Sequence, residues 1–397
     1  MVELEFSIME NNPGDIAKLR QMLEIFESQY RIRVNPIGIT WAQGWTEIAK
    51  FGIYRHGPDV SAIGTTWIGS LAGMQALRPF TGPEIQALGG DAAFFEPSWR
   101  AGFMPGDRNL WAVPWLGDVM LLYFWEKPLI KAGITDFRAA FATDDALVKT
   151  LERLQQSGVE YPLAINLQSN SIILHEAAHW VWNAGGDFVH PDGKSVAFDQ
   201  PAALRGFHNY FSLKPYISPE LLTTAYTGSL FNTSQAAIHF AGPWLGTALE
   251  NPDWGGDIPH VLALPGTTFT GGLSFVIWQY TLHPREAFEL VRFLATQPVQ
   301  APTSVYHHQV PTRSEAVNVP LNENNVFHRS YAQYLQSIQR GRSFPTMHLW
   351  GAVEDKLRVG LSNIWADLFD NPTQDLDQCI AKHLVPLARR LNMTLGN

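Results

Sequence analysis

Cysteine and charged residues are both scarce in this sequence. Among 397 residues only Cys379 carries a thiol, so no disulfide can form within the chain, and we expect a buried structural thiol. Lys, Arg, Asp and Glu together make up 16% of the residues, and the formal net charge is −9. No segment is rich in Lys or Arg, which argues against a nucleic acid as partner.

Long apolar runs are missing as well. No run approaches the roughly 18–20 residues that a helix needs to span a bilayer. The chain begins Met-Val-Glu-Leu-Glu-Phe, without the basic and apolar regions of a secretory signal. We therefore expect either a cytosolic protein or a mature form whose signal segment has been removed, and the resemblance described below favours the second.

Most catalytic signatures are also absent, with one exception. Neither a Gly-x-Ser-x-Gly elbow nor a Gly-x-x-x-x-Gly-Lys phosphate loop occurs. His175-Glu176-Ala177-Ala178-His179 matches the zinc pattern His-Glu-x-x-His in a helical segment. However, the third histidine of the extended pattern would fall on Gly185, and no glutamate occurs between Glu176 and Glu220. A zinc metallopeptidase therefore stays an alternative, as does a glycoside hydrolase, because aromatic clefts with paired carboxylates also cleave glycans.

Tryptophan, in contrast, is abundant. The 14 tryptophans often stand beside glycine, proline and turn residues, where an indole can line a cleft instead of a core. Sugar rings present apolar faces to aromatic side chains, and their hydroxyls bond to carboxylates, amides and backbone groups. The composition therefore favours an aromatic-lined cleft, and the many tryptophans would fit a sugar, a glycoside, a polyol or a cationic osmolyte held by cation–π contacts.

The periodicity of apolar residues predicts an α/β protein. Residues 4–8 alternate as a strand does, residues 16–26 repeat at helical spacing, and further strands are expected at 32–39 and 60–63. This strand–helix–strand order predicts a mostly parallel sheet, in which ligands bind beyond the carboxyl ends of the strands.

The length predicts two lobes, because one core rarely serves more than about 250–300 residues. We expect an N-terminal lobe of residues 1–115 plus 268–312 and a C-terminal lobe of residues 116–267 plus 313–397, which includes a helical tail. Several crossings between lobes would form a multi-strand hinge that permits closure on a ligand.

Five short blocks occur in order along most of the chain. They are Gly57-Pro58-Asp59-Val60 with Gly64-Thr65-Thr66-Trp67, Val113-Pro114-Trp115-Leu116-Gly117-Asp118, Trp182-Asn183-Ala184-Gly185-Gly186-Asp187, Gly242-Pro243-Trp244, and Leu264-Pro265-Gly266 with Gly271-Gly272. In this order they resemble the family 1 extracellular solute-binding proteins of ABC importers, the group that contains the maltose-binding protein.

The resemblance implies a periplasmic-binding-protein type II fold, with two α/β lobes and a ligand cleft between them. It also implies an extracytoplasmic location, in the periplasm or as a cell-surface lipoprotein, and a small carbohydrate as the usual ligand. The partners would be the transmembrane permease subunits of an ABC transporter. We expect a monomer without catalytic residues, cofactor or metal.

The candidate ligand residues stand at turns and predicted strand ends. Trp244 follows a Gly-Pro turn that exposes an indole, and Asp118 lies at the first predicted crossing, where its carboxylate can accept hydroxyl bonds. Gly185 and Gly186 would let backbone amides approach the ligand, although ending a helix explains them equally well. The remaining candidates are Glu10, Trp41, Thr66, Trp67, Trp182, Gly272 and Arg313.

Overall fold

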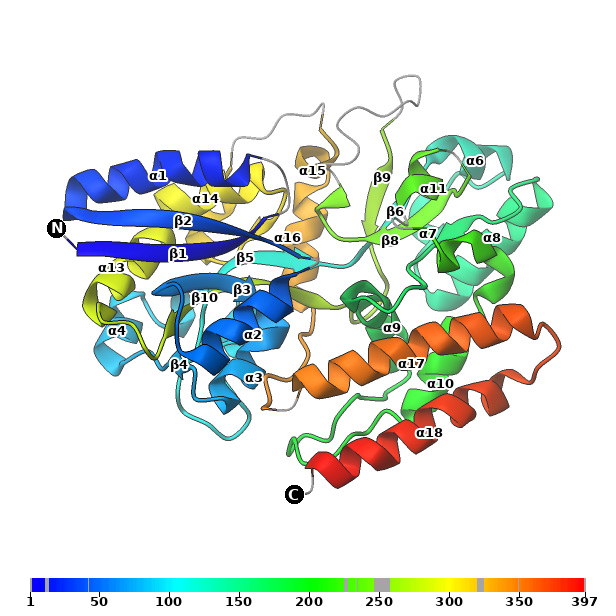
Figure 1. The fold of residues 1–397 in the computed structure, drawn as a ribbon. Coiled ribbons are helices and arrows are strands. Elements are labelled where there is room, and N and C mark those ends of the chain that lie inside the picture. Colours follow the sequence, from blue (N-terminus) through cyan, green and yellow to red (C-terminus); the bar gives the residue numbers. More distant parts are fainter. Residues whose placement is uncertain are drawn as a thin grey trace. The chain divides into compact units, whose positions relative to one another are not determined.

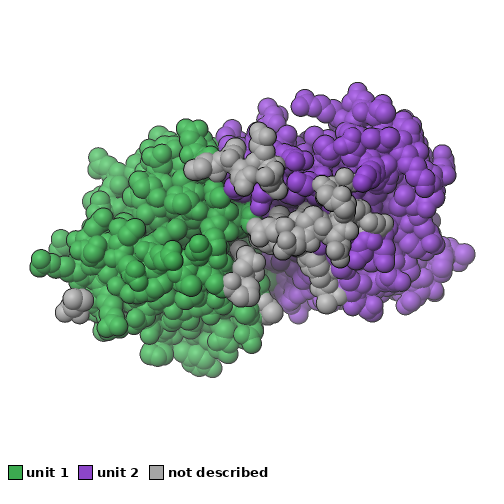
Figure 2. Space-filling model, turned by 90° about the horizontal axis from the view of Figure 1, so that it is seen from above, with its two compact units in different colours: residues 1–118, 270–320, 343–351 green, residues 119–269, 321–342, 352–397 purple. Residues whose placement is uncertain are grey.

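The chain folds into two compact units, coloured separately in Figure 2. The computed structural model describes residues 2–10, 14–41, 43–224, 228–233, 235–245, 258–319, 325–348 and 350–395. Unit 1 comprises Met1–Asp118, Thr270–Pro320 and Ser343–Gly351, and unit 2 comprises Val119–Phe269, Leu321–Arg342 and Ala352–Asn397. Within the described ranges, no helix combines the length and the apolar character of a membrane span.

Unit 1 is built on a mixed sheet with the order β11-β5-β10-β3-β1-β2, and β4 pairs with β10. The first three strands are parallel, as predicted from the sequence, whereas β10 runs antiparallel to β3. The bounds are β1 Val2–Glu10, β2 Ile32–Thr40, β3 Val60–Gly64, β4 Leu77–Arg78, β5 Val113–Val119, β10 Thr270–Trp278 and β11 Val310–Pro311.

Helices cover both faces of this sheet (Figure 1). Since β1 lies between β2 and β3, right-handed crossovers place α1 and α2 on opposite faces. Helix α1 turns Leu19, Leu23 and Phe26 inward at helical spacing, each at most 3% exposed. The helical elements are α1 Asp15–Tyr30, α2 Gly44–Tyr54, η1 Thr65–Trp67, α3 Ile68–Gly73, α4 Gly82–Ala87, η2 Asp91–Ala93, α5 Glu96–Arg100, α13 Pro284–Leu294, α14 Gln297–Tyr306 and η5 Ser314–Val317.

Unit 2 combines a small sheet with many helices. Its sheet has the order β7-β8-β6-β9, formed by β7 Leu163–Ala164, β8 Ile238–Ala241, β6 Leu121–Phe124 and β9 His260–Ala263. The helical elements are α6 Glu126–Lys131, α7 Phe137–Ala140, α8 Asp144–Gln156, α9 Ser171–Asn183, α10 Pro201–Phe211, η3 Lys214–Tyr216, η4 Pro219–Leu222, α11 Gly228–Asn232, α15 Val326–Arg329, α16 Tyr331–Arg340, α17 Trp350–Asp370 and α18 Leu376–Leu395.

The unit boundaries differ from the expected lobes by two or three residues at 116–118, which belong to unit 1, and at 268–269, which belong to unit 2, and they differ more widely in the C-terminal third of the chain. Residues 313–320 and 343–351, expected in the C-terminal lobe, belong to unit 1. Hydrogen bonds hold the later segment there, because Thr346 Oγ1 donates to the carbonyl of Ala101 at 2.8 Å and Gly351 N donates to Ser70 Oγ at 3.2 Å. These partners lie more than 240 residues away in the sequence, so a helical pattern in the tail does not reveal them.

Candidate functional site

The carboxyl ends of β1, β2 and β3 share one edge of the unit 1 sheet. Glu10 ends β1, Trp41 follows β2, and Thr66 and Trp67 form the short helix η1 that follows β3. The chain leaves β1 toward β2 on one side, while β3 lies on the other side. Such a reversal of strand order is where open α/β sheets bind their ligands.

Three tryptophans gather at this edge. The ring centroids of Trp41 and Trp67 lie 5.7 Å apart at 55°, and those of Trp45 and Trp67 lie 6.0 Å apart at 50°. Trp41 is 41% exposed, while the other two indoles are partly buried. Gly44 makes room for the cluster, since a Cβ there would lie 2.8 Å from the Trp67 ring. The cluster therefore presents an indole to solvent on a packed aromatic support.

The carboxylate of Glu10 lies against the neighbouring strand. A Cβ on Gly38 would fall 2.3 Å from Glu10 Cδ, so the carboxylate occupies the space that a larger residue in β2 would fill. Glu10 is partly exposed, and its two oxygens are acceptors for hydroxyl groups at the same sheet edge as the indoles.

Asp118 stands near the end of β5 with one oxygen unused. Gln309 Nε2 donates to its Oδ2 at 2.9 Å, whereas Oδ1 is buried and has no hydrogen-bond partner among the described residues. Burial raises the pKa of this carboxyl to about 6, although the hydrogen bond from Gln309 acts in the opposite direction. The group can therefore accept a hydroxyl bond when ionised and donate one when protonated.

Gly272 lets β10 approach β5 closely. Its φ of +129° suits glycine, and a Cβ there would lie 2.0 Å from the carbonyl oxygen of Leu116. The next residue, Leu273, pairs with Gly64 at the end of β3. Asp118 thus lies on the same edge as Trp67, Glu10 and Trp41, which extends over four strand spacings, or about 19 Å.

Arg313 also belongs to unit 1, but its side chain makes contacts within the unit instead of facing a ligand site. The guanidinium donates to the carbonyl of Leu88 at 3.1 Å and to Glu315 Oε1 at 2.5 Å. It also lies over the ring of Phe94 at 5.2 Å, and the side chain is only 15% exposed. These contacts explain Arg313 by packing, in contrast to the ligand role expected from the sequence.

In unit 2, Trp244 lies in the turn after β8. The indole folds back over the start of its own turn, since a Cβ on Gly242 would lie 1.7 Å from the ring. Trp244 nevertheless remains partly exposed, as the Gly-Pro-Trp sequence predicts.

Trp182 has a more enclosed environment than the sequence suggested. It is 7% exposed, and its Nε1 donates to Asp187 Oδ1 at 3.4 Å. The guanidinium of Arg342 lies 5.0 Å from the ring centroid and forms an ion pair with Asp187. Arg342 therefore covers the indole face that a sugar would need.

Gly185 and Gly186 end helix α9. Gly185 has a φ of +78° and its N–H donates to Trp182 O, while the Gly186 N–H donates to Val181 O. This is the Schellman arrangement that closes a helix at a left-handed glycine. A Cβ on Gly186 would lie 2.5 Å from backbone atoms of Ala203 in α10. Of the two roles weighed for these glycines, the structure supports helix termination and close packing.

The His-Glu-x-x-His pattern has separate partners for each of its three side chains. His175 is stacked on Phe269 at 3.8 Å, and burial lowers its pKa to about 3. Glu176 accepts the backbone N–H of Asn166 with both oxygens, and His179 Nε2 lies 2.9 Å from Asp144 Oδ1. Among the described residues these histidines are not part of a metal-binding group. The zinc metallopeptidase alternative is therefore not supported.

Trp45 and Gln309 were not predicted from the sequence. Trp45 lies within α2, four residues after Trp41, and this spacing on a helix is the signal that could have found it. Gln309 contacts Asp118 across 191 residues, and no local pattern signals such a pair.

Comparison with known proteins places these features in a family. The profile described as bacterial extracellular solute-binding protein matches residues 21–327. No curated protein matches the sequence significantly.

Solved structures align over almost the whole chain. The GacH receptor of Streptomyces glaucescens GLA.O, solved with and without acarbose, is 16% identical with a TM-score of 0.80 and covers 100% of this chain and 99% of its own. The sugar-binding protein MalE of Xanthomonas citri is 18% identical with a TM-score of 0.81, covering 99% and 97%. An ABC transporter solute-binding protein of Thermotoga lettingae TMO, bound to α-D-tagatose, is 18% identical with a TM-score of 0.80, covering 100% of both chains. The predicted type II periplasmic-binding-protein fold is confirmed.

Proposed function

The chain belongs to the family of bacterial extracellular solute-binding proteins, and we propose that it captures a carbohydrate for an ABC importer. One observation carries the proposal. The cluster of three tryptophans lies along the same sheet edge of unit 1 as the carboxyl groups of Glu10 and Asp118, where the strand order reverses. Aromatic faces and hydroxyl acceptors are the two features that a sugar ring requires of its site.

In the proposed binding mode a sugar ring lies on the exposed indole of Trp41. Glu10 and Asp118 accept hydroxyl bonds, and Thr66 adds a hydroxyl of its own. Trp244, whose indole is partly exposed within unit 2, stays a separate candidate for an aromatic contact.

The type of ligand is supported by the similar structures. The similar structures include complexes with acarbose and α-D-tagatose, and MalE3 of T. maritima was solved with maltose bound. These are one-ring to several-ring carbohydrates, so they support carbohydrate as the class without selecting one sugar. A sheet edge of about 19 Å would hold more than one ring.

Family membership supports a proposal for the partners and the location. We propose that the protein works outside the cytoplasm, in the periplasm or as a cell-surface lipoprotein, and delivers its ligand to transmembrane permease subunits. It acts as a monomer and performs no chemistry on the ligand. A glycoside hydrolase would instead release new reducing ends from the sugar, which a reducing-sugar assay detects.

The test is calorimetric titration of the full chain with maltose, maltotriose, acarbose and tagatose. For any sugar that binds, Trp41→Ala should weaken binding about tenfold or more, as expected for an aromatic anchor. Tyr54→Ala is the matched control, because this aromatic residue of the same unit is 73% exposed and lies outside the cluster. Failure of every sugar to bind would refute the proposal, and equal affinity of the Trp41 variant would remove this edge from the site.

A further inference from the structure

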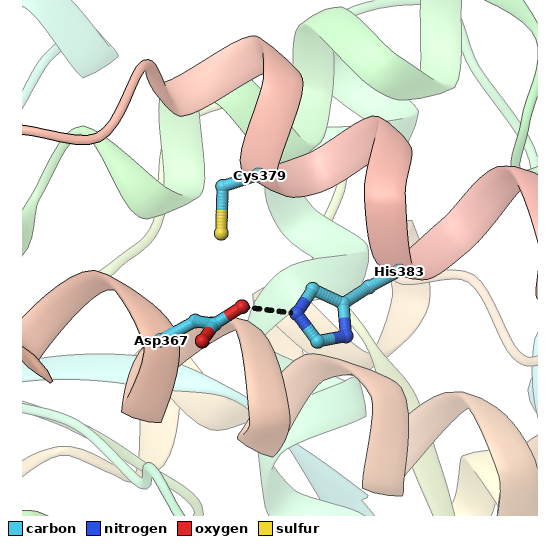
Figure 3. Close-up of side chains that lie close together, drawn as sticks. All are labelled: Asp367, Cys379 and His383. Atoms are coloured by element: carbon cyan, nitrogen blue, oxygen red, sulfur yellow. Dashed lines mark hydrogen bonds and ion pairs between the residues drawn. The ribbon is translucent and has the colours of Figure 1, made fainter. Parts of the chain in front are cut away.

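Two C-terminal helices of unit 2 bring together three side chains that commonly bind metal ions (Figure 3). Asp367 lies in the last turn of α17, and Cys379 and His383 lie four residues apart on α18, so they share a helix face. One ligand atom from each residue lies within 4.8 Å of the other two. Figure 3 shows the three side chains converging in the space between the two helices.

The separations suit a small cation after minor side-chain rotation. Zinc bonds of about 2.0–2.3 Å in tetrahedral geometry place ligand atoms roughly 3.3–3.8 Å apart. Asp367 Oδ2 and His383 Nε2 are 2.8 Å apart, somewhat closer than that, and the largest separation in the group is within 4.8 Å. To reach these separations, the Asp367 and His383 ligand atoms must move apart and the Cys379 sulfur must approach them. Each shift is about 1 Å or less and needs no movement of the helices.

Charge and exposure also fit a divalent ion. A thiolate and a carboxylate together carry two negative charges, and imidazole adds a neutral nitrogen ligand. Cys379 is fully buried, while the side chains of His383 and Asp367 are 20% and 24% exposed. The thiol is therefore protected, and one side of the group remains accessible to an entering ion and to a water ligand.

Lys382 supplies the positive charge in the metal-free protein. Its Nζ contacts Asp367 Oδ2 at 2.8 Å, the same oxygen that His383 contacts, and its side chain is 61% exposed. The lysine can therefore swing into solvent when a cation takes its place. Burial and the nearby Asp367 charge raise the pKa of the Cys379 thiol, so a metal ion must displace the thiol proton on binding.

We propose that Asp367, Cys379 and His383 bind Zn²⁺ or a similar borderline-soft divalent cation, with solvent as the fourth ligand. The mixed sulfur, nitrogen and oxygen set excludes preference for Mg²⁺ or Ca²⁺, which favour oxygen ligands. The bound ion links α18 to α17 through its ligands and stabilises the packing of these two C-terminal helices. The proposal is independent of sugar capture, since all three ligands lie in the helical hairpin of unit 2.

The test uses the full chain, reduced, stripped with a chelator and desalted. Calorimetric titration with Zn²⁺ should give one ion per chain, and Co²⁺ should give a thiolate-to-cobalt charge-transfer band in the near ultraviolet. Cys379→Ala and His383→Gln should each lower the Zn²⁺ affinity on the order of 100-fold or more, since even supporting residues around a metal contribute 10–100-fold. Lys382→Gln should raise it, because the competing cation is removed.

His208→Gln is the matched control. It removes another His–Asp pair of unit 2, in which His208 Nδ1 lies 2.7 Å from Asp377 Oδ1, and it should leave the Zn²⁺ affinity unchanged. Absence of stoichiometric binding, or equal affinity of the Cys379→Ala variant, would reduce the group to an ion pair beside a buried thiol. The cobalt spectrum of the unmodified protein needs no variant, so its lack of a charge-transfer band would overturn the proposal even if the variants fail to fold. Sugar titrations of the same preparations keep the two proposals separate.

Discussion

Asp118 is the residue whose protonation most directly links stability to the proposed site. Its Oδ2 accepts a bond from Gln309, yet its buried Oδ1 has no partner among the described residues, and burial raises its pKa to about 6. A buried carboxyl with an unsatisfied oxygen lowers stability, but beside the proposed sugar site that oxygen is well placed to accept a ligand hydroxyl. We therefore propose that the loss of folding stability at Asp118 is tolerated because the carboxyl serves in ligand binding.

This cost predicts a pH dependence. The carboxyl binds its proton more tightly in the native state than in the unfolded chain, where its pKa is near 3.8, so the free energy of unfolding should fall as pH rises from about 4 to about 6. Asp118→Asn should remove that loss, which is on the order of 1–3 kcal/mol. Urea unfolding at pH 4.5 and pH 7.5 measures it; identical pH profiles for the two proteins would contradict the assignment.

At the scale of elements, glycines determine how closely backbones approach. Gly186 and Gly206 lie where α9 and α10 meet, and a Cβ on Gly206 would come within 2.4 Å of Val181 Cα. Gly272 does the same for β10 against β5. A sequence pattern shows that such glycines end helices or form turns. Only the packed neighbour shows whether glycine is needed for its backbone conformation or because a Cβ would not fit.

Gly185 and Gly186 separate these two requirements experimentally. Around Gly185 a Cβ would meet nothing within 4 Å, so Gly185→Ala should cost only the left-handed strain, about 1 kcal/mol. Gly186→Ala must displace the backbone of α10 and should cost more, about 1–3 kcal/mol or beyond. Chemical denaturation of both variants checks the order, and an equal cost would show that α9 and α10 adjust freely.

At the scale of the whole molecule, ligand binding should appear as thermal stabilisation. A sugar present at 100 times its Kd should add about 2.7 kcal/mol to the free energy of unfolding, if it binds only the native state. Scanning calorimetry of the full chain should therefore show a Tm that rises with sugar concentration. The same rise is expected for the Cys379→Ala variant, because the proposed metal ligands lie on α17 and α18, and none of the proposed sugar contacts lies on these helices. Loss of the sugar effect in that variant would contradict their independence.

The sequence by itself determined the class of the protein and the candidate residues of the proposed site, but not their partners. Alternating and helical spacing reveals strands and helices because side-chain direction follows local backbone geometry. Strand ends then follow directly, which is why Glu10, Trp41 and Trp67 could be predicted together at one edge. The ordered blocks likewise predicted the solute-binding family that the profile match establishes.

Only the tertiary structure decided which candidates are available to a ligand. Arg313 and Trp182 were candidates from the sequence as Trp41 was, but the Arg313 guanidinium packs on Phe94 and the Arg342 guanidinium lies over the Trp182 ring. The pairing of Asp118 with Gln309 and the convergence of Asp367 with Cys379 were equally hidden. Burial and electrostatic surroundings depend on neighbours brought close by folding, and local spacing along the chain carries no record of those neighbours.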